Sequence, residues 1–443
     1  MPNSEPPDGA KRPILKKVIN TFQLWAIAVG MVISGIYFGW NYGWAVSGTL
    51  GFLVATLIVT VLYITFIFSY TELTTAIPDA GGPFTYTRRA MGKTAGFIAG
   101  FGTLIDFVMA PPAIAFALGS YANFLNPNLP VMVIAVLAYF IFISINILGI
   151  RQSANFSIIV TLLSVAELLI FMVIVLPYFK TENFVNHAIP ITASGVFAAL
   201  PYAVWFYIAI EGVAMVAEEV KEPNQTIPKG YILSIGTLVF LVLGIMLLSG
   251  GATDWRLLSQ IDYPLPETLS LTLGRGSFWS KAFASLGLFG LIASFHCNTI
   301  GYSRQIFALS RDGYLPKVLS ELHPKYKTPY MALFAGGLFG LIALVAGKTQ
   351  QVIILSVLGA LVMYIASMLS LMVLRKTEPN LKRPYKTPFY PVFPIIALVL
   401  SGLCLTSIIY FNAALSILFF SVLLVSLLFF WGVGIHYVKP QLK

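Results

Sequence analysis

The stretch "PYAVWFYIAIEGVAMVAEEV", residues 201–220, places Glu211 inside a run of aromatic and aliphatic residues. A carboxylate is costly to bury in apolar surroundings unless a partner charge, a proton or hydrogen-bond donors compensate it. What surrounds this run therefore decides how the chain folds and why the acid is there.

The chain as a whole is too apolar for a soluble protein. Of its 443 residues, 58% are hydrophobic and 10% are charged, whereas charged residues make up about a quarter of soluble domains. Uncharged runs extend from Val18 to Thr71, from Phe107 to Ile150 and from Thr387 to Val438. Each run is long enough for two helical spans of about 20 residues. The composition predicts an all-α polytopic membrane protein.

Apolar runs bounded by polar residues or by Gly/Pro turns predict about twelve membrane-spanning helices. With an even number of spans, both ends of the chain are expected on one side of the membrane. The spans are expected near 18–47, 51–77, 94–124, 130–150, 155–178, 194–218, 229–252, 282–309, 329–347, 350–374, 390–410 and 412–437.

The distribution of positive charge predicts the orientation of these spans. Cytoplasmic loops of membrane proteins carry an excess of Lys and Arg, so we expect a plasma-membrane protein with cytoplasmic tails at 1–17 and 438–443. The net charge of +10 then follows from topology and does not predict a nucleic-acid partner. Of the 27 Lys and Arg residues, all but five lie on the side of the termini, the exceptions being Lys180, Arg256, Arg275, Lys281 and Lys348.

Glycines interrupt two of the predicted spans near their middles. In "MVISGIYFGWNYG" the first span contains Ser34-Gly35 and Gly39, and the sixth is interrupted from Ala209 to Gly212. Unwound backbone inside a bilayer is tolerated only where it lines a cavity or is buried in protein. The first and sixth spans are equivalent if ten helices form two inverted five-helix halves, 18–178 and 194–375, as in many transporters. Glycine also permits close helix packing, so the spacing alone leaves both interpretations open.

Three loop motifs together resemble the amino acid, polyamine and organocation (APC) transporter superfamily. They are "ELTTAIPDAGGPFTYTRRAMG" from Glu72, "EGVAMVAEEVKEPNQTIPKG" from Glu211 and "SRQIFALSRDGYLPK" from Ser303. The resemblance implies two inverted five-helix halves, two extra helices at 390–437, and a substrate held at the breaks in helices one and six. It also implies a secondary transporter that works by alternating access, coupled to protons or to Na⁺ or exchanging substrates.

Shorter strings are most similar to the bacterial ethanolamine permeases. They are "ISGIYFGWNYG", "DFVMAPPAIA" and "WFYIAIEGVAMVAEEVKEP". This similarity implies import of a small cationic amine, with ethanolamine as the first candidate and an amino acid or polyamine as the alternative. The oligomeric state and the coupling ion stay open.

The first helix departs from the pattern of amino acid carriers. These carriers show a Gly-Ser/Ala-Gly stretch whose N–H groups hold the substrate carboxylate, and the matching residues here are Ile33, Ser34 and Gly35. Isoleucine cannot take a positive φ cheaply and its side chain blocks close approach, so we expect a carboxylate to fit less well. An amine that lacks a carboxylate suits this departure.

An ammonium group taken out of water needs an opposite charge, carbonyl oxygens or aromatic faces. The sixth span offers all three: the charge of Glu211, the freed carbonyls expected around Trp205 and Ile208, and the Trp205 ring. By resemblance, Asp106 lies on the pocket-lining part of helix three. We hypothesise that Asp106 meets the ammonium, while Glu211 holds the break or carries a coupling proton; the alternative is a protonated Glu211 that only caps N–H groups. The expected substrate-binding residues are Ser34, Gly35, Ile36, Asp106, Trp205, Ile208 and Glu211.

Further candidates concern gating and coupling. Tyr207 adds an aromatic ring beside Trp205, and Glu167 lies one turn beyond Ser164, where some relatives carry a lysine. Glu167 and His296 are candidates for proton binding, with buried packing residues as the alternative. Arg–carboxylate pairs at the cytoplasmic ends would fit an inner gate, with plain topology charges as the alternative; the residues are Glu72, Arg88, Arg89, Arg304, Arg311 and Asp312.

The sequence argues against catalysis and against a resident metal or cofactor. It contains no GxSxG, HExxH or phosphate-binding loop motif, which disfavours an enzyme. His296-Cys297 has no second pair at ligand spacing, so no metal site is expected. A channel is the other alternative, but broken helices at mid-membrane favour alternating access.

Overall fold

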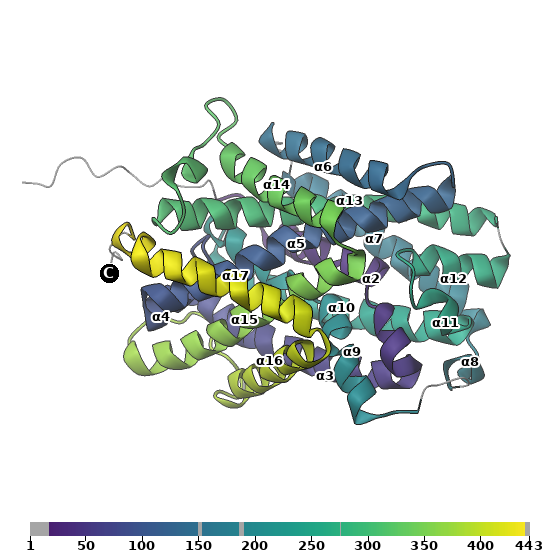
Figure 1. The fold of residues 1–443 in the computed structure, drawn as a ribbon. Coiled ribbons are helices and arrows are strands. Elements are labelled where there is room, and N and C mark those ends of the chain that lie inside the picture. Colours follow the sequence, from purple (N-terminus) through teal and green to yellow (C-terminus); the bar gives the residue numbers. More distant parts are fainter. Residues whose placement is uncertain (1–16, 149–152, 186–189, 275, 439–443) are drawn as a thin grey trace, which may run out of the picture.

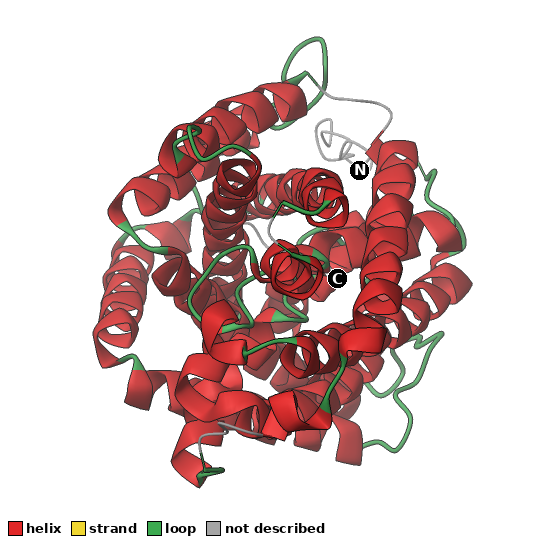
Figure 2. Cartoon of the chain, turned by 90° about the vertical axis from the view of Figure 1, so that its right-hand side faces the viewer, coloured by secondary structure: helices red, strands yellow, loops and turns green. Residues whose placement is uncertain are grey.

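The computed structural model describes residues 17–148, 153–185, 190–274 and 276–438. Within these residues the ordered elements are helices, apart from one isolated bridge between Ile19 and Val220, and Figure 2 shows only helices and loops. In this part of the chain nine helices are long and apolar enough to cross a membrane, and three shorter helices are also apolar. The all-helical polytopic fold predicted from the sequence is confirmed.

The helices follow the predicted spans. The membrane-length and shorter apolar helices are α1 (Thr21–Val32), α3 (Tyr42–Ala76), α5 (Lys93–Leu125), α6 (Val131–Ile147), α7 (Ser153–Val175), α9 (Ala193–Trp205), α10 (Pro223–Ala252), α13 (Phe278–Arg311), α14 (Tyr330–Ala346), α15 (Thr349–Thr377), α16 (Val392–Phe411) and α17 (Ala413–Gly432). The short helices are α2 (Ser34–Tyr37), α4 (Pro83–Met91), α8 (Thr181–Val185), α11 (Trp255–Leu258), α12 (Pro264–Leu273), and the 3-10 helices η1 (Leu176–Tyr178), η2 (Ile210–Glu219), η3 (Lys317–Ser320) and η4 (Gly434–His436).

Two features of the helices differ from the prediction. The turn expected between the first two spans is instead a kink inside α3, where Gly48 takes φ 65° and ψ −177°. Four short helices, α4, α8, α11 and α12, were not predicted, because they are too short and too polar to register as apolar spans. Figure 1 shows α8, α11 and α12 at the end of the molecule opposite the C-terminus.

The contacts between helices repeat in the two halves of the chain. α1 packs against α7 and α10, and its counterpart α9 packs against α15 and α3. In the same way α5 packs on α6 and α14, α13 packs on α14 and α6, and the α7–α13 contact matches the contact of α15 with α5. Two equivalent five-helix halves would produce this pattern. The boundaries 18–178 and 194–375 stay a prediction.

The contact between α5 and α15 depends on two glycines. A Cβ atom at Gly359 would lie 2.5 Å from the carbonyl oxygen of Gly102 and 2.7 Å from the backbone nitrogen of Asp106. Small residues allow such close backbone approach between membrane helices. The approach holds Asp106 against α15, where the Ser356 hydroxyl donates to its Oδ1 at 2.8 Å.

We expect Gly359→Ala to destabilise the protein by about 1–3 kcal/mol, because its methyl group would meet backbone atoms that no side-chain rotation can move. The midpoint of thermal unfolding of purified protein in detergent measures this loss. Gly402→Ala in α16 is the matched control, since a Cβ there meets nothing within 4 Å. Equal midpoints for the two variants would contradict the packing argument.

Candidate functional site

The first predicted span is interrupted beside Ser34-Gly35 and again at Gly39, as the sequence predicted. α1 ends at Val32 and α2 continues to Tyr37, and the chain leaves the helix at Phe38, which is extended, and at Gly39, with φ 90°. Ile33 has φ −58° and ψ −27°, an ordinary right-handed conformation. The Ile33 side chain is fully buried.

The sixth span is interrupted where the sequence predicted it. α9 ends at Trp205, a turn follows, and η2 starts at Ile210 as a 3-10 helix. Ala209 between them has φ 78°, a left-handed conformation that costs a residue with a Cβ atom roughly 1–2 kcal/mol. The surrounding packing holds this strain at the break.

The two breaks lie directly against each other. The Trp205 indole N–H donates to the carbonyl oxygen of Phe38 at 3.0 Å. A Cβ at Gly35 would lie 2.3 Å from the Trp205 carbonyl oxygen, and one at Gly39 would lie 2.4 Å from its Nε1. Only glycine at both positions allows Trp205 to reach the opened backbone of the first span.

The backbone opened between α1 and α2 is satisfied by α13. The carbonyl oxygen of Met31 accepts hydrogen bonds from Ser294 Oγ at 2.8 Å and Asn298 Nδ2 at 3.2 Å. The hydroxyl oxygens of Ser294 and Ser34 lie 2.7 Å apart, within hydrogen-bond distance. Sequence reasoning missed Ser294 and Asn298, although polar residues four apart in an apolar helix are a signal for a shared polar face. His296 lies about 200° around the helix from Ser294, so the structure does not bring it to the break.

Asp106 and Glu211 form a buried carboxyl pair. The two residues are 1% and 0% exposed, and their carboxyl groups lie close enough to interact with each other. The Ser356 hydroxyl donates to Oδ1 of Asp106, and the Tyr364 hydroxyl donates to Oε2 of Glu211 at 3.0 Å. The other oxygens, Oδ2 and Oε1, are buried and have no hydrogen-bond donor among the described residues. Two carboxyl groups can hydrogen-bond only if one carries a proton, because two carboxylates repel.

A line of hydroxyl groups connects this pair to the end of α9. The hydroxyls of Tyr364 and Tyr63 lie 2.9 Å apart, and Tyr63 donates to the carbonyl oxygen of Val204 at 3.2 Å. Tyr207 hydrogen-bonds Thr60 at 2.8 Å. The side chain of Tyr207, the predicted gating residue, therefore faces α3.

Glu167 belongs to a separate group of polar residues. The Tyr37 hydroxyl on α2 donates to its Oε2 at 2.8 Å, and Tyr121 on α5 donates to the carbonyl oxygen of Tyr37 at 3.1 Å. Glu167 is thus linked to the first break through Tyr37. Of the remaining candidates, Ile36 accepts a hydrogen bond from the Trp40 indole at 2.9 Å through its carbonyl oxygen, and Ile208 is buried in the turn after α9.

Ion pairs tie the helices together at the end where the described chain begins and ends. Arg88 pairs with Asp312 at 2.5 Å, Arg304 with Glu219 at 2.7 Å and Arg311 with Glu218 at 3.9 Å. Arg89 pairs with Glu378 at 2.7 Å. The six charged residues predicted for this end all have partners, whereas sequence reasoning did not identify Glu218, Glu219 or Glu378.

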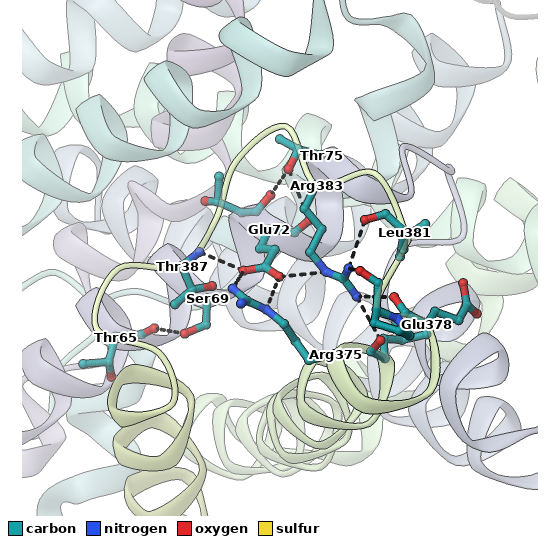
Figure 3. Close-up of polar contacts among 12 residues, drawn as sticks. Thr65, Ser69, Glu72, Thr75, Arg375, Glu378, Leu381, Arg383 and Thr387 are labelled. Carbon is teal, nitrogen blue, oxygen red and sulfur yellow. Dashed lines mark hydrogen bonds and ion pairs between the residues drawn. The ribbon is translucent and has the colours of Figure 1, made fainter.

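Glu72 has the most complete set of partners in this region. Figure 3 shows its carboxylate between Arg375 and Arg383. Arg375 donates to both oxygens at 2.7 and 2.6 Å, Arg383 Nε lies 3.2 Å away, and the Thr387 backbone N–H donates at 2.7 Å. Glu72 is 1% exposed. Its ion pairs and hydrogen bonds join the end of α3 to α15 and to the segment that leads to α16.

Backbone hydrogen bonds join the first and sixth spans at the same end. The N–H groups of Val18 and Ile19 donate to the carbonyl oxygen of Glu219 at 2.8 and 3.0 Å, and the Lys221 N–H donates to that of Ile19 at 2.8 Å. α1 and η2 are therefore fixed to each other by main-chain bonds.

The opposite end is closed by a different set of contacts. Asn41 donates to the carbonyl oxygens of Leu258 and Ile261 at 2.6 and 2.8 Å. Asp262 accepts from the hydroxyls of Tyr42 and Thr349 at 2.5 and 2.7 Å. Burial raises the pKa of the Asp262 carboxyl, and these two hydrogen bonds oppose that shift. The segment between α11 and α12 is thereby tied to both halves of the chain.

We expect Glu72→Gln to cost about 3–5 kcal/mol, because it removes the charge that neutralises two partly or fully buried guanidinium groups. The matched control is Glu378→Gln, which breaks a pair whose side chains are 33% and 34% exposed and should cost no more than about 1 kcal/mol. Thermal unfolding of both variants in detergent measures the difference. A Glu72→Gln protein as stable as the control would show that the cluster does not hold the α3–α15 contact.

Comparison with known proteins gives a family and several relatives. A family model described as amino acid permease matches residues 19–440. The chain is 27% identical to the branched-chain amino acid permease BcaP of Bacillus subtilis, over 87% of this chain and 86% of that protein. It is 26% identical to the methylthioribose transporter of Bacillus subtilis, over 89% and 88%. It is 24% identical to the low-affinity putrescine importer PlaP of Escherichia coli, over 73% and 74%.

Proposed function

The chain belongs to the amino acid permease family of membrane transporters, and from this premise we propose that it imports a small cationic amine by alternating access. Ethanolamine is the first candidate substrate. The proposal includes a plasma-membrane location with both termini in the cytoplasm, for which the excess of Lys and Arg on that side is the support.

The observation that carries the proposal is the carboxyl pair of Asp106 and Glu211 beside the break in the sixth span. In the described part of the chain their side-chain hydrogen-bond partners, Ser356 and Tyr364, are uncharged. Acidic residues inside membrane spans are expensive and usually mark ion or substrate pathways. A pair of acids with uncharged neighbours favours a cation, and an ammonium group would supply the compensating charge.

The geometry at Gly35 supports an amine that lacks a carboxylate. A substrate carboxylate bound at the first break would need to approach N–H groups around Ser34 and Gly35. The Trp205 carbonyl oxygen occupies the space against Gly35, where a Cβ would lie only 2.3 Å from it. An oxygen with partial negative charge at this point disfavours a carboxylate, and it also provides an acceptor for an ammonium group.

An amino acid substrate is the second candidate. Two relatives with nearly complete coverage, BcaP and the serine/threonine exchanger SteT of Bacillus subtilis, carry amino acid names. Binding an amino acid in the same way would require Trp205 to move away from Gly35 and free this stretch for the carboxylate. A polyamine is a further alternative, because the relative PlaP is named as a putrescine importer.

We further propose that protons are coupled to transport through the same pair. Two acids as close as Asp106 and Glu211 favour a shared proton, and a cation that enters between them removes that need. Substrate and proton would then compete for one site. Glu167 is the alternative proton carrier, since it is buried and held by Tyr37 at the first break.

We expect ethanolamine to raise the unfolding temperature of the purified protein, while alanine, leucine and putrescine leave it unchanged. Only the first presents one ammonium group without a carboxylate or a second charge. In Asp106→Asn the stabilisation by ethanolamine should be lost, because the neutral amide no longer attracts the cation. Thermal shift and calorimetry both measure this binding.

Asp254→Asn serves as the control for this experiment. It makes the same chemical change at an acid that pairs with an exposed Arg256, and it should keep full ethanolamine binding. Stabilisation by alanine or leucine instead of ethanolamine would replace the amine proposal with an amino acid carrier.

We expect about one proton to be released for each ethanolamine bound, because the cation takes over the charge compensation that the shared proton provides. Calorimetric titrations in two buffers with different ionisation enthalpies measure this number. The affinity should rise with pH for the same reason. Glu211→Gln should abolish the release; release that persists in Glu211→Gln and disappears in Glu167→Gln would assign the proton to Glu167.

A further inference from the structure

A cavity of about 750 Å³ opens away from the helix breaks, at the end of the molecule that carries the ion pairs. It lies between the last turn of α13, the segment 313–322 that follows it, and the ends of α17 and η4. Figure 1 shows α17 on the outside of the bundle, with its far end beside the C-terminus. The cavity is therefore placed where a membrane-spanning bundle meets the surface of the bilayer.

One wall of the cavity carries two cations. Arg311 and Lys317 both line it, and Lys317 is exposed. The Arg311 guanidinium lies 5.7 Å above the ring of Phe307, which is also part of the wall. Its Nη2 lies 3.9 Å from Glu218, beyond ordinary hydrogen-bond length, and its buried Nε–H has no acceptor among the described residues. An anion in the cavity would satisfy this donor.

The opposite wall is apolar and faces outward. Phe429 and Val433 line the cavity and are 68% and 46% exposed. They lie on and just after α17, a helix with exposed apolar side chains along much of its length. Side chains of this kind at the end of an outer span are suited to contact acyl chains.

We propose that this cavity binds an anionic phospholipid. The phosphate would lie between Arg311 and Lys317, and the start of the acyl chains would pack on Phe429 and Val433. Basic pockets between membrane helices at the bilayer surface are a recognised way of binding acidic headgroups. The apolar wall and the volume, which is far larger than a phosphate ion, favour a lipid over a soluble anion. The two cations favour an acidic lipid over a zwitterionic one.

Such a lipid would act on the contact between α13 and η2. Its phosphate would compete with Glu218 for Arg311, and Glu218 also accepts from the Ala80 N–H at 2.9 Å. The proposal does not depend on the identity of the transported substrate, because no residue of the cavity belongs to the helix breaks.

Native mass spectrometry of the purified protein tests the proposal, with phosphatidylglycerol and phosphatidylcholine of identical acyl chains as probes. We expect phosphatidylglycerol to bind about tenfold or more tightly than phosphatidylcholine. The double variant Arg311→Gln/Lys317→Gln should lose that preference. Lys382→Gln, an exposed residue of the same charge in the segment between α15 and α16, is the matched control and should keep it.

Three results would overturn the proposal. The first is equal binding of the two lipids by the unaltered protein, and the second is an unchanged preference in the double variant. The third is displacement of phosphatidylglycerol by inorganic phosphate or glycerol 3-phosphate, which would identify a site for soluble anions. If the double variant does not fold, Lys317→Gln alone replaces an exposed side chain and should still weaken phosphatidylglycerol binding severalfold.

Discussion

The contact of Gly35 with the Trp205 carbonyl is the constraint on which the rest of the structure depends. A membrane interior offers no water to backbone groups that leave a helix, so each must find a partner within the protein. The carbonyl oxygen of Phe38 accepts a hydrogen bond from the Trp205 indole, and that of Met31 accepts from Ser294 and Asn298 of α13. These bonds hold the first span, the sixth span and α13 together at one level. They leave the carboxyl pair of Asp106 and Glu211 beside the opened backbone.

The chain buries carboxylates in two physically different ways. Glu72 is surrounded by two guanidinium groups and a backbone N–H, so its charge is fully compensated and its role is structural. Asp106 and Glu211 lie beside each other with hydroxyl groups as partners, and neither forms an ion pair in the described part of the chain. A buried group that is incompletely compensated adds little to stability. This contrast distinguishes the candidate substrate site at Asp106 and Glu211 from the ion-pair cluster at Glu72.

Sequence reasoning predicted the features that depend on local composition. Uncharged run lengths predicted the spans, and glycine positions predicted the two interrupted helices. It placed the interruption of the first span at Ser34-Gly35 and Gly39, and the helix is divided after Val32 and again at Phe38 and Gly39. It did not predict the approach of Trp205 to Gly35, because that contact joins distant segments. The pairing of Asp106 with Glu211, and of Glu72 with Arg375, depends on which helices cross, and no local pattern encodes that.

Two kinds of contact join the helices at the end that carries the ion pairs. α1 and η2 are joined by three main-chain hydrogen bonds, whereas η2 and α13 are joined there by the side chains of Glu218, Glu219, Arg304 and Arg311. Partly exposed ion pairs contribute little free energy and re-form with water at small cost. Main-chain hydrogen bonds do not depend on the ordering of long charged side chains, and three of them act together here. At this end α13 is therefore held to η2 by weaker contacts than those that hold α1 to η2.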